Sequence, residues 1–164
     1  MTIIEATIIE NIAKTHTPAL VLYARQFFKG GNLHAAEDVV QEVLHRLSQQ
    51  PSLPENLVGW LYTAVRNGAI SAARSDKRRE KREHCAGTPA QPMFQPEKEN
   101  PFDAEKIALS LEKLDREQRE IVTLHLWSDL PFSEIATLLG KPKTTVFRRY
   151  AEALETLRQL LDEP

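Results

Sequence analysis

PFSEIATLLGKPKTTVFRR, residues 131–149, contains a helix end and a helix start only a few residues apart. Its first half predicts a helix with one apolar face, formed by Ile135, Ala136, Leu138 and Leu139. Gly140 suits the left-handed conformation that ends many helices, and Pro142 prevents the first helix from continuing. A second helix is expected to begin between Lys143 and Thr145. Two helices joined by such a turn are typical of the helix-turn-helix motif.

The second of these helices has an apolar side and a polar side. We expect the apolar residues, which recur at steps of three and four, to be buried: Val146, Tyr150, Leu154, Leu157 and Leu161. The other side offers groups that can contact phosphates and base edges in a major groove, here called the recognition set: Lys143, Thr144, Thr145, Phe147, Arg148 and Arg149. Any pair of packed helices can be joined by a glycine turn, and exposed arginines are usually only solvated. The motif therefore favours DNA binding over simple helix packing only weakly. Phe147 can contact a thymine methyl group or pack on Leu138.

Helical periods extend outward from this motif, and the sequence shows no convincing strand. Asp115, with Gln118 three residues later, resembles a capping box at the start of a preceding helix. Towards the N-terminus, three more helices are predicted within residues 16–28, 34–47 and 56–74, the first of them starting at Pro18. Paired glycines, Gly30 and Gly31, separate the first two. The predicted fold class is therefore all-α.

Composition changes sharply after Arg74. Alternating charges are followed by a segment with four prolines and few apolar residues, which is typical of a linker. We expect two small helical domains, residues 1–85 and 102–164, joined by a linker at residues 86–101. The second of these domains contains the helix-turn-helix.

Overall composition excludes several functional classes. The net charge of −2 does not by itself indicate a nucleic-acid partner, and the single cysteine, Cys85, excludes an internal disulfide and a cysteine-rich zinc site. No basic leader or long apolar run is present, so we expect a cytoplasmic protein with no membrane partner. No glycine-rich phosphate loop or nucleophile motif is found, and the histidines are scattered: His16, His34, His45, His84 and His125. We expect no catalysis, metal or cofactor.

Two stretches in a fixed order resemble a known family. Residues 36–47, AEDVVQEVLHRL, and 59–79, GWLYTAVRNGAISAARSDKRR, look like the second-region helices of extracytoplasmic-function sigma factors, small promoter-recognition subunits of bacterial RNA polymerase. Residues 111–157 are similar to the fourth region of that family. The resemblance spans about residues 19–161 and implies two helical domains joined by a linker.

The resemblance assigns roles to individual residues. It implies that an acidic set on the second helix docks on the clamp coiled coil of the polymerase β′ subunit: Glu37, Asp38, Gln41 and Glu42. It implies that the following loop and helix bind the downstream promoter element, through a downstream set: Asn56, Arg66, Asn67, Arg74, Lys77, Arg78 and Arg79. The recognition set would read the upstream element. The implied partners are core polymerase, through its β′ clamp and β flap, and promoter DNA, with an anti-sigma protein left open.

The residues support these roles to different degrees. Between Arg66 and Glu83, seven Lys or Arg stand against three Asp or Glu, an excess that suits a phosphate backbone. Trp60 lies on the apolar stripe of its helix and is better interpreted as a core residue than as a base-stacking one. The recognition helix sequence VFRRYAEAL departs from the small and basic residues usual in the family, which leaves the promoter preference open.

Two other functions remain open from the sequence. The chain could be a stand-alone helix-turn-helix regulator, or an adaptor that has kept the fold and lost its DNA contacts. A regulator needs a dimer interface or an effector pocket in its first domain, whereas a sigma factor needs an acidic docking face and a basic strand-binding helix. The sequence pattern fits the latter.

Overall fold

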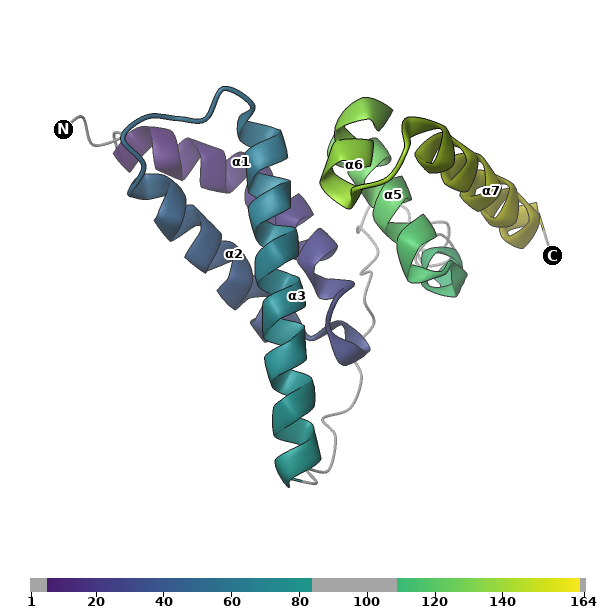
Figure 1. Cartoon of the computed structure of the whole chain (residues 1–164), viewed down its shortest axis with the longest axis horizontal. Helices are drawn as coiled ribbons and strands as arrows, with labels where there is room; N and C mark the ends of the chain where they lie inside the picture. Colours follow the sequence, from purple (N-terminus) through teal and green to yellow (C-terminus); the bar gives the residue numbers. More distant parts are fainter. Residues whose placement is uncertain (1–5, 84–108, 163–164) are drawn as a thin grey trace. The chain divides into compact units, whose positions relative to one another are not determined.

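The computed structural model describes residues 6–83 and 109–162, and the chain falls into two compact units, residues 1–91 and 92–164. Within the described ranges all regular structure is helical, which confirms the predicted fold class (Figure 1). The predicted linker, residues 86–101, lies outside the described residues, as does Cys85.

The first unit is a bundle of three helices, α1 (Ala6–Arg25), α2 (Leu33–Ser48) and α3 (Leu57–Glu83). Each helix packs against the other two (Figure 1). Tyr23 lies at the centre, with its ring edge-on to Phe27 at 5.4 Å and to Tyr62 at 5.3 Å between centroids. Fully buried aliphatic side chains from all three helices complete the core: Leu20, Val40, Val43, Leu47, Leu61 and Val65.

The turn between α1 and α2 depends on the paired glycines. Gly30 and Gly31 have φ of 68° and 65°, in the left-handed region that glycine adopts without strain. The buried side chain of Arg25 donates a hydrogen bond from Nε to the carbonyl oxygen of Gly31 at 2.7 Å. Asn32 then caps α2, since its Oδ1 accepts from the backbone N–H of Ala35 at 3.2 Å.

The predicted start of the first helix at Pro18 is wrong. α1 runs without interruption from Ala6 to Arg25, with Pro18 inside it. Proline removes one backbone donor, which would leave the carbonyl of Lys14 without its helical partner. Both residues are exposed, so water can bind the carbonyl, and the apolar face of the helix continues through the interruption.

α3 is the longest helix, and its two halves have different environments. In the first half, Gly68 allows close approach to α2, because a Cβ there would lie 3.1 Å from Cγ1 of Val39. The second half extends beyond the ends of α1 and α2 (Figure 1). Its described side chains there include exposed Arg74, Lys77 and Arg78.

The second unit contains α5 (Arg116–Leu126), α6 (Phe132–Leu139) and α7 (Lys143–Asp162), preceded by helical residues 109–113. The predicted cap of α5 is confirmed, because Oδ1 of Asp115 accepts from the backbone N–H of Gln118 at 2.8 Å. Arg119 joins α5 to the preceding segment by donating from its guanidinium to the carbonyls of Leu111 at 3.1 Å and Leu114 at 2.9 Å. Burial lowers the pKa of Arg119, while Glu112 and Asp115 act in the opposite direction.

The predicted buried stripe of α7 is only partly correct. Val146 is fully buried, but Leu154 and Leu161 are 39% and 36% exposed. Ala153, seven residues after Val146 and so on the same face, is fully buried instead. Both Ala153 and Leu154 are apolar, so the spacing alone does not show which of them faces α5 and α6.

Candidate nucleic-acid and partner interfaces

The helix-turn-helix is formed by α6, a turn at residues 140–142 and α7. Gly140 adopts φ 65° and ψ 35°, and Lys141 donates from its backbone N–H to the carbonyl of Ala136 at 3.0 Å. A Cβ at Gly140 would meet nothing within 4 Å, so its left-handed backbone, and not the space around it, selects glycine. The predicted end of α6 at Gly140 is confirmed, and α7 begins at Lys143, within the predicted range from Lys143 to Thr145.

The recognition set lies in the first two turns of α7. Lys143, Thr144, Phe147 and Arg148 are exposed, whereas Thr145 and Arg149 are half-buried. The Arg148 side chain is 68% exposed and approaches Glu152 only to 3.9 Å. This end of α7 therefore presents two cations, a hydroxyl and an aromatic ring to solvent.

Arg149 differs from Arg148 because it belongs to an ion-pair network. Its guanidinium lies 3.5 Å from Glu117 and 3.9 Å from Asp115, both at the start of α5, and 3.6 Å from Glu152. Lys141 in the turn also pairs with Glu117, with Nζ 2.7 Å from Oε1. The positive charge of Arg149 is therefore balanced within the unit, a fact that its position on the helix does not reveal.

An aromatic cluster lies behind the exposed end of α7. The rings of His125 and Phe132 stack at 4.3 Å between centroids, and Tyr150 packs edge-on to both, at 4.9 Å and 5.0 Å. His125 donates from Nδ1 to the carbonyl of Leu130 at 2.9 Å, which fixes its ring. Phe147 joins the cluster by an edge-on contact with Phe132 at 5.5 Å.

The predicted docking set lies on the outer face of α2. Asp38, Gln41 and Glu42 are exposed and Glu37 is half-buried, while Val40 and Val43 point into the bundle. Glu37 lies 3.9 Å from Nδ1 of His34. In the described part of the chain, Asp38 and Glu42 have no ion-pair partner, so their charges are available to a partner protein.

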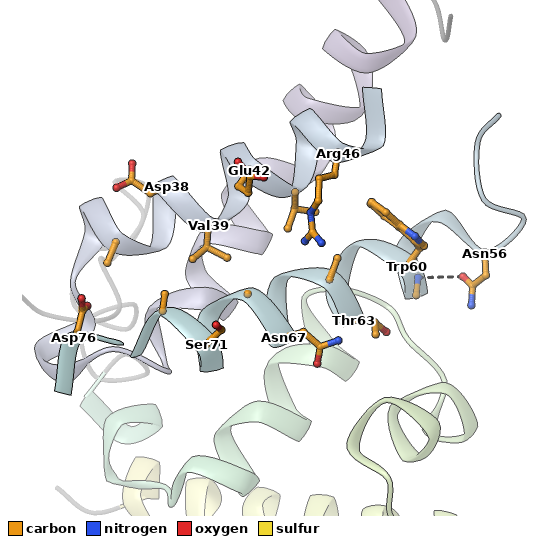
Figure 2. Close-up of a pocket in the computed structure, with 16 residues that line it drawn as sticks. Asp38, Val39, Glu42, Arg46, Asn56, Trp60, Thr63, Asn67, Ser71 and Asp76 are labelled. Carbon is orange, nitrogen blue, oxygen red and sulfur yellow. Dashed lines mark hydrogen bonds between the residues drawn. The ribbon is translucent and has the colours of Figure 1, made fainter. Parts of the chain in front are cut away.

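A groove runs between α2 and α3 (Figure 2). It brings Asp38 and Glu42 of the docking set together with Asn56 and Asn67 of the downstream set. Asn56 has a structural role as well, because its Oδ1 accepts from the backbone N–H of Gly59 at 3.1 Å and so caps the start of α3.

Trp60 is not a core residue, contrary to the sequence interpretation. Its side chain is half-buried and lines the groove. In Figure 2, Arg46 points from α2 towards α3, and Trp60 points from α3 towards α2. The groove thus contains a cation, an aromatic face and two amides, groups that can bind unstacked bases, together with the carboxylates of Asp38, Glu42 and Asp76.

Sequence reasoning missed several groove residues, although a signal for them exists. Arg46, Thr63 and Ser71 also line the groove, and the sequence pattern assigns them no role. Trp60, Asn67 and Ser71 recur at intervals of seven and four residues, which places them on one face of α3, and Asn56, four residues before Trp60, caps the same helix. The apolar period of the same helix predicts only the face that packs in the bundle, and the groove residues lie outside it.

The basic residues of the downstream set lie apart from the groove lining. Arg66 is half-buried, and the remaining four are exposed along the second half of α3: Arg74, Lys77, Arg78 and Arg79. The structure therefore separates the downstream set into two amides at the groove, four exposed cations along the second half of α3, and Arg66 in its first half.

Among the described residues, no group of three or more His, Cys, Asp or Glu side chains is placed to hold a metal ion. No described helix has the length and apolar character needed to span a membrane.

Comparison with protein families gives two matches, in the order expected from the sequence. Residues 12–79 match the model of sigma-70 region 2, and residues 104–157 match that of sigma-70, region 4. The chain is 32% identical to the ECF RNA polymerase sigma factor SigL of Mycobacterium tuberculosis, over 97% of this chain and 92% of SigL. It is 34% identical to the ECF RNA polymerase sigma factor EcfG of Rhodopseudomonas palustris, over 80% of this chain and 74% of EcfG.

Two solved structures share the fold. The sigma factor RpoE of Bartonella quintana, crystallised with the anti-sigma factor NepR, superposes with a TM-score of 0.73 at 24% identity, covering 94% of this chain and 98% of RpoE. CnrH, in complex with the cytosolic domain of CnrY, superposes with a TM-score of 0.60 at 21% identity, covering 96% of this chain and 90% of CnrH.

Proposed function

Because this chain belongs to the extracytoplasmic-function (ECF) family of RNA polymerase sigma factors, we propose that its two units divide promoter recognition between them. As a sigma factor, it binds core RNA polymerase and directs transcription initiation at a specific set of promoters. We assign core docking and the downstream element to the first unit, and the upstream element to the second. The reaction chemistry is assigned to the polymerase, and the protein is proposed to act in the cytoplasm.

The single observation that supports this division best is the separation of charge in the first unit. Asp38 and Glu42 are exposed and unpaired among the described residues of α2, while exposed cations follow one another along the end of α3. An acidic face suits docking on a basic surface of the polymerase clamp, and a basic helix suits a phosphate backbone. A stand-alone regulator needs neither.

We assign strand binding in the downstream element to the groove and the basic end of α3. A base released from the duplex can stack on the exposed part of Trp60, and the amide of Asn67 can hydrogen-bond its edge. Arg74 and Arg78 can then contact phosphates further along the same strand. Asn56 contributes its amide N–H groups, because its Oδ1 already caps α3.

We assign duplex binding in the upstream element to the start of α7. Lys143, Thr144 and Arg148 provide exposed donors for phosphates and base edges, at the end of the helix that a helix-turn-helix inserts into the major groove. Arg149 is assigned a supporting role, since its guanidinium pairs with carboxylates of α5 and α7. Contact of the second unit with the β flap and regulation by an anti-sigma protein are further proposals from the family.

The test is a pull-down with purified core polymerase, followed by run-off transcription from a library of promoter fragments. The protein alone should bind duplex DNA weakly at physiological salt, because each small unit neutralises few phosphates. Specific binding and transcripts should appear only on mixing, since core holds both units and links two weak contacts. Tight sequence-specific binding by the protein alone, without association with core, would establish a stand-alone regulator instead.

A further inference from the structure

Phe147 is more exposed than any other large apolar side chain in the described residues, at 58%. It lies in the second turn of α7, where Lys143 is four residues before it and Thr144 three residues before it, so all three share one face. Both neighbours are exposed and polar. The ring of Phe147 is thus exposed among hydrogen-bonding groups on the outer face of α7. This position suggests that the ring itself contacts a bound molecule.

The ring is held in place from behind. It meets Phe132 edge-on, with an interplanar angle of 82° and 5.5 Å between centroids. Phe132 in turn packs against Tyr150 and stacks on His125, whose ring is fixed by its hydrogen bond to Leu130. A ring supported in this way loses little conformational entropy when its free face is covered.

The ion-pair network strengthens the case for Phe147. Arg149, which is adjacent in α7, directs its guanidinium to Glu117 and Glu152, so it does not compete for the same surface. The outward face therefore consists of polar donors around one apolar ring. In the major groove, the only apolar group that a base pair presents is the 5-methyl of thymine.

We propose that Phe147 determines upstream-element specificity by contacting the 5-methyl group of one thymine. This inference rests on the proposed function, because it requires α7 to enter the major groove. It specifies that one base of the upstream element is thymine, whereas the proposed function does not specify any base. The supporting residue is Phe132, which positions the ring and does not touch the DNA.

The test uses holoenzyme reconstituted from core polymerase and the full chain. Upstream elements are first selected from randomised promoter fragments, and each thymine of the selected element is then replaced in turn by deoxyuridine, which lacks only the methyl group. At one position the replacement should weaken wild-type binding about fourfold, the effect of exposing one buried methyl-sized group. Phe147→Ala should bind thymine and deoxyuridine equally there. Phe147→Leu, which keeps an apolar side chain, should retain part of the preference.

Leu154→Ala is the matched control, since it removes another partly exposed apolar side chain from α7 and should leave the thymine preference intact. Thermal melting of each variant shows whether the second unit stays folded. A selected element without thymine, or a deoxyuridine effect that persists in Phe147→Ala, would overturn the proposal while leaving upstream recognition standing. Loss of core association in Phe147→Ala would show that the ring contacts protein instead. If selection with folded wild-type holoenzyme yields no preferred upstream sequence, the proposed function itself fails.

Discussion

Glu117, in the first turn of α5, forms a 2.7 Å ion pair with Lys141 in the turn of the helix-turn-helix. The other oxygen of the same carboxylate lies 3.5 Å from Arg149 on α7. One acidic side chain thus restrains Arg149, which belongs to the recognition set, and Lys141, which lies just before it. The pairing links the motif to α5 and balances part of its positive charge within the unit.

Replacing Glu117 with glutamine should increase the salt dependence of promoter binding. The substitution releases Lys141 and weakens the restraint on Arg149, which keeps Asp115 and Glu152 as partners. The slope of log K against log salt should steepen by about 0.9 for each new phosphate contact. Fluorescence anisotropy of holoenzyme on labelled promoter DNA at several salt concentrations measures the slope. Glu155→Gln, at an exposed position of α7, is the control. An unchanged slope in E117Q would mean that the ion pairs do not limit access to DNA.

Alanine at Arg148 and at Arg149 should have different effects. R148A should weaken promoter binding by about 1–3 kcal/mol if the side chain contacts a base, and should leave the melting temperature unchanged because the side chain is exposed. R149A should lower the melting temperature, since it leaves Glu117 paired with Lys141 alone and removes the closer of the two cations beside Glu152. Binding isotherms and thermal melts on both variants make the comparison. Equal binding by R148A and wild type would argue against its place in the recognition set.

Charge reversal on α2 should abolish docking without unfolding the protein. D38R combined with E42R places two positive charges on the face assigned to the polymerase clamp, where they repel a basic partner surface. Pull-down with core polymerase measures association, and circular dichroism checks the fold. E10R combined with E155R changes the net charge equally at exposed sites outside the docking set. Normal association of the D38R/E42R variant would refute the docking assignment.

Removing charge from the end of α3 should impair opening of the downstream element. The triple alanine variant of Lys77, Arg78 and Arg79 loses contacts to a single strand, and the salt slope of open-complex formation should decrease by about 0.7 for each lost contact. Permanganate reactivity of unpaired thymines measures opening. The control removes three exposed lysines elsewhere: Lys14, Lys29 and Lys113. If both triple variants open the promoter equally, the end of α3 has no such role.

Arg119→Ala should destabilise the second unit by about 2 kcal/mol, because the carbonyls of Leu111 and Leu114 lose their charged donor. The effect should appear in urea denaturation as a lower midpoint with an unchanged slope. Arg158→Ala, at an exposed position of α7, is the control and should unfold as the wild type does. An R119A midpoint equal to that of wild type would show that water replaces the guanidinium at no cost.

Local signals made parts of this structure predictable. Gly140 and Pro142 mark the turn, and Asp115 caps α5 by accepting a hydrogen bond from a residue three positions later. Each feature depends only on residues close together in the sequence, so a short stretch is enough to predict it. The contact between Glu117 and Arg149 spans 32 residues and depends on how α5 and α7 pack, which no local period expresses.

Residues at the edge of an apolar stripe are partly buried, and their burial is hard to predict from sequence. Trp60 follows the apolar period of α3, yet it lies at the edge of the buried stripe, where an indole can face both the bundle and the groove. Similarly, Ala153 and Leu154 fit the same pattern, and only the packed structure shows that the smaller one is buried. Sequence periodicity identifies a helix face more reliably than it identifies the residues at the boundary of that face.

Because α3 is one uninterrupted helix, it fixes the spacing of the side chains that are proposed to bind the DNA strand. Arg74 and Arg78 follow Asn67 by seven and eleven residues, close to two and three full turns, so all three lie in phase along one line of the helix. At 1.5 Å per residue, the line from Asn67 to Arg78 is about 16 Å long. Inserting one residue after Ala72 would rotate the cations by about 100° relative to the groove while preserving every charge. Register along the strand is therefore set by helical phase as well as by composition.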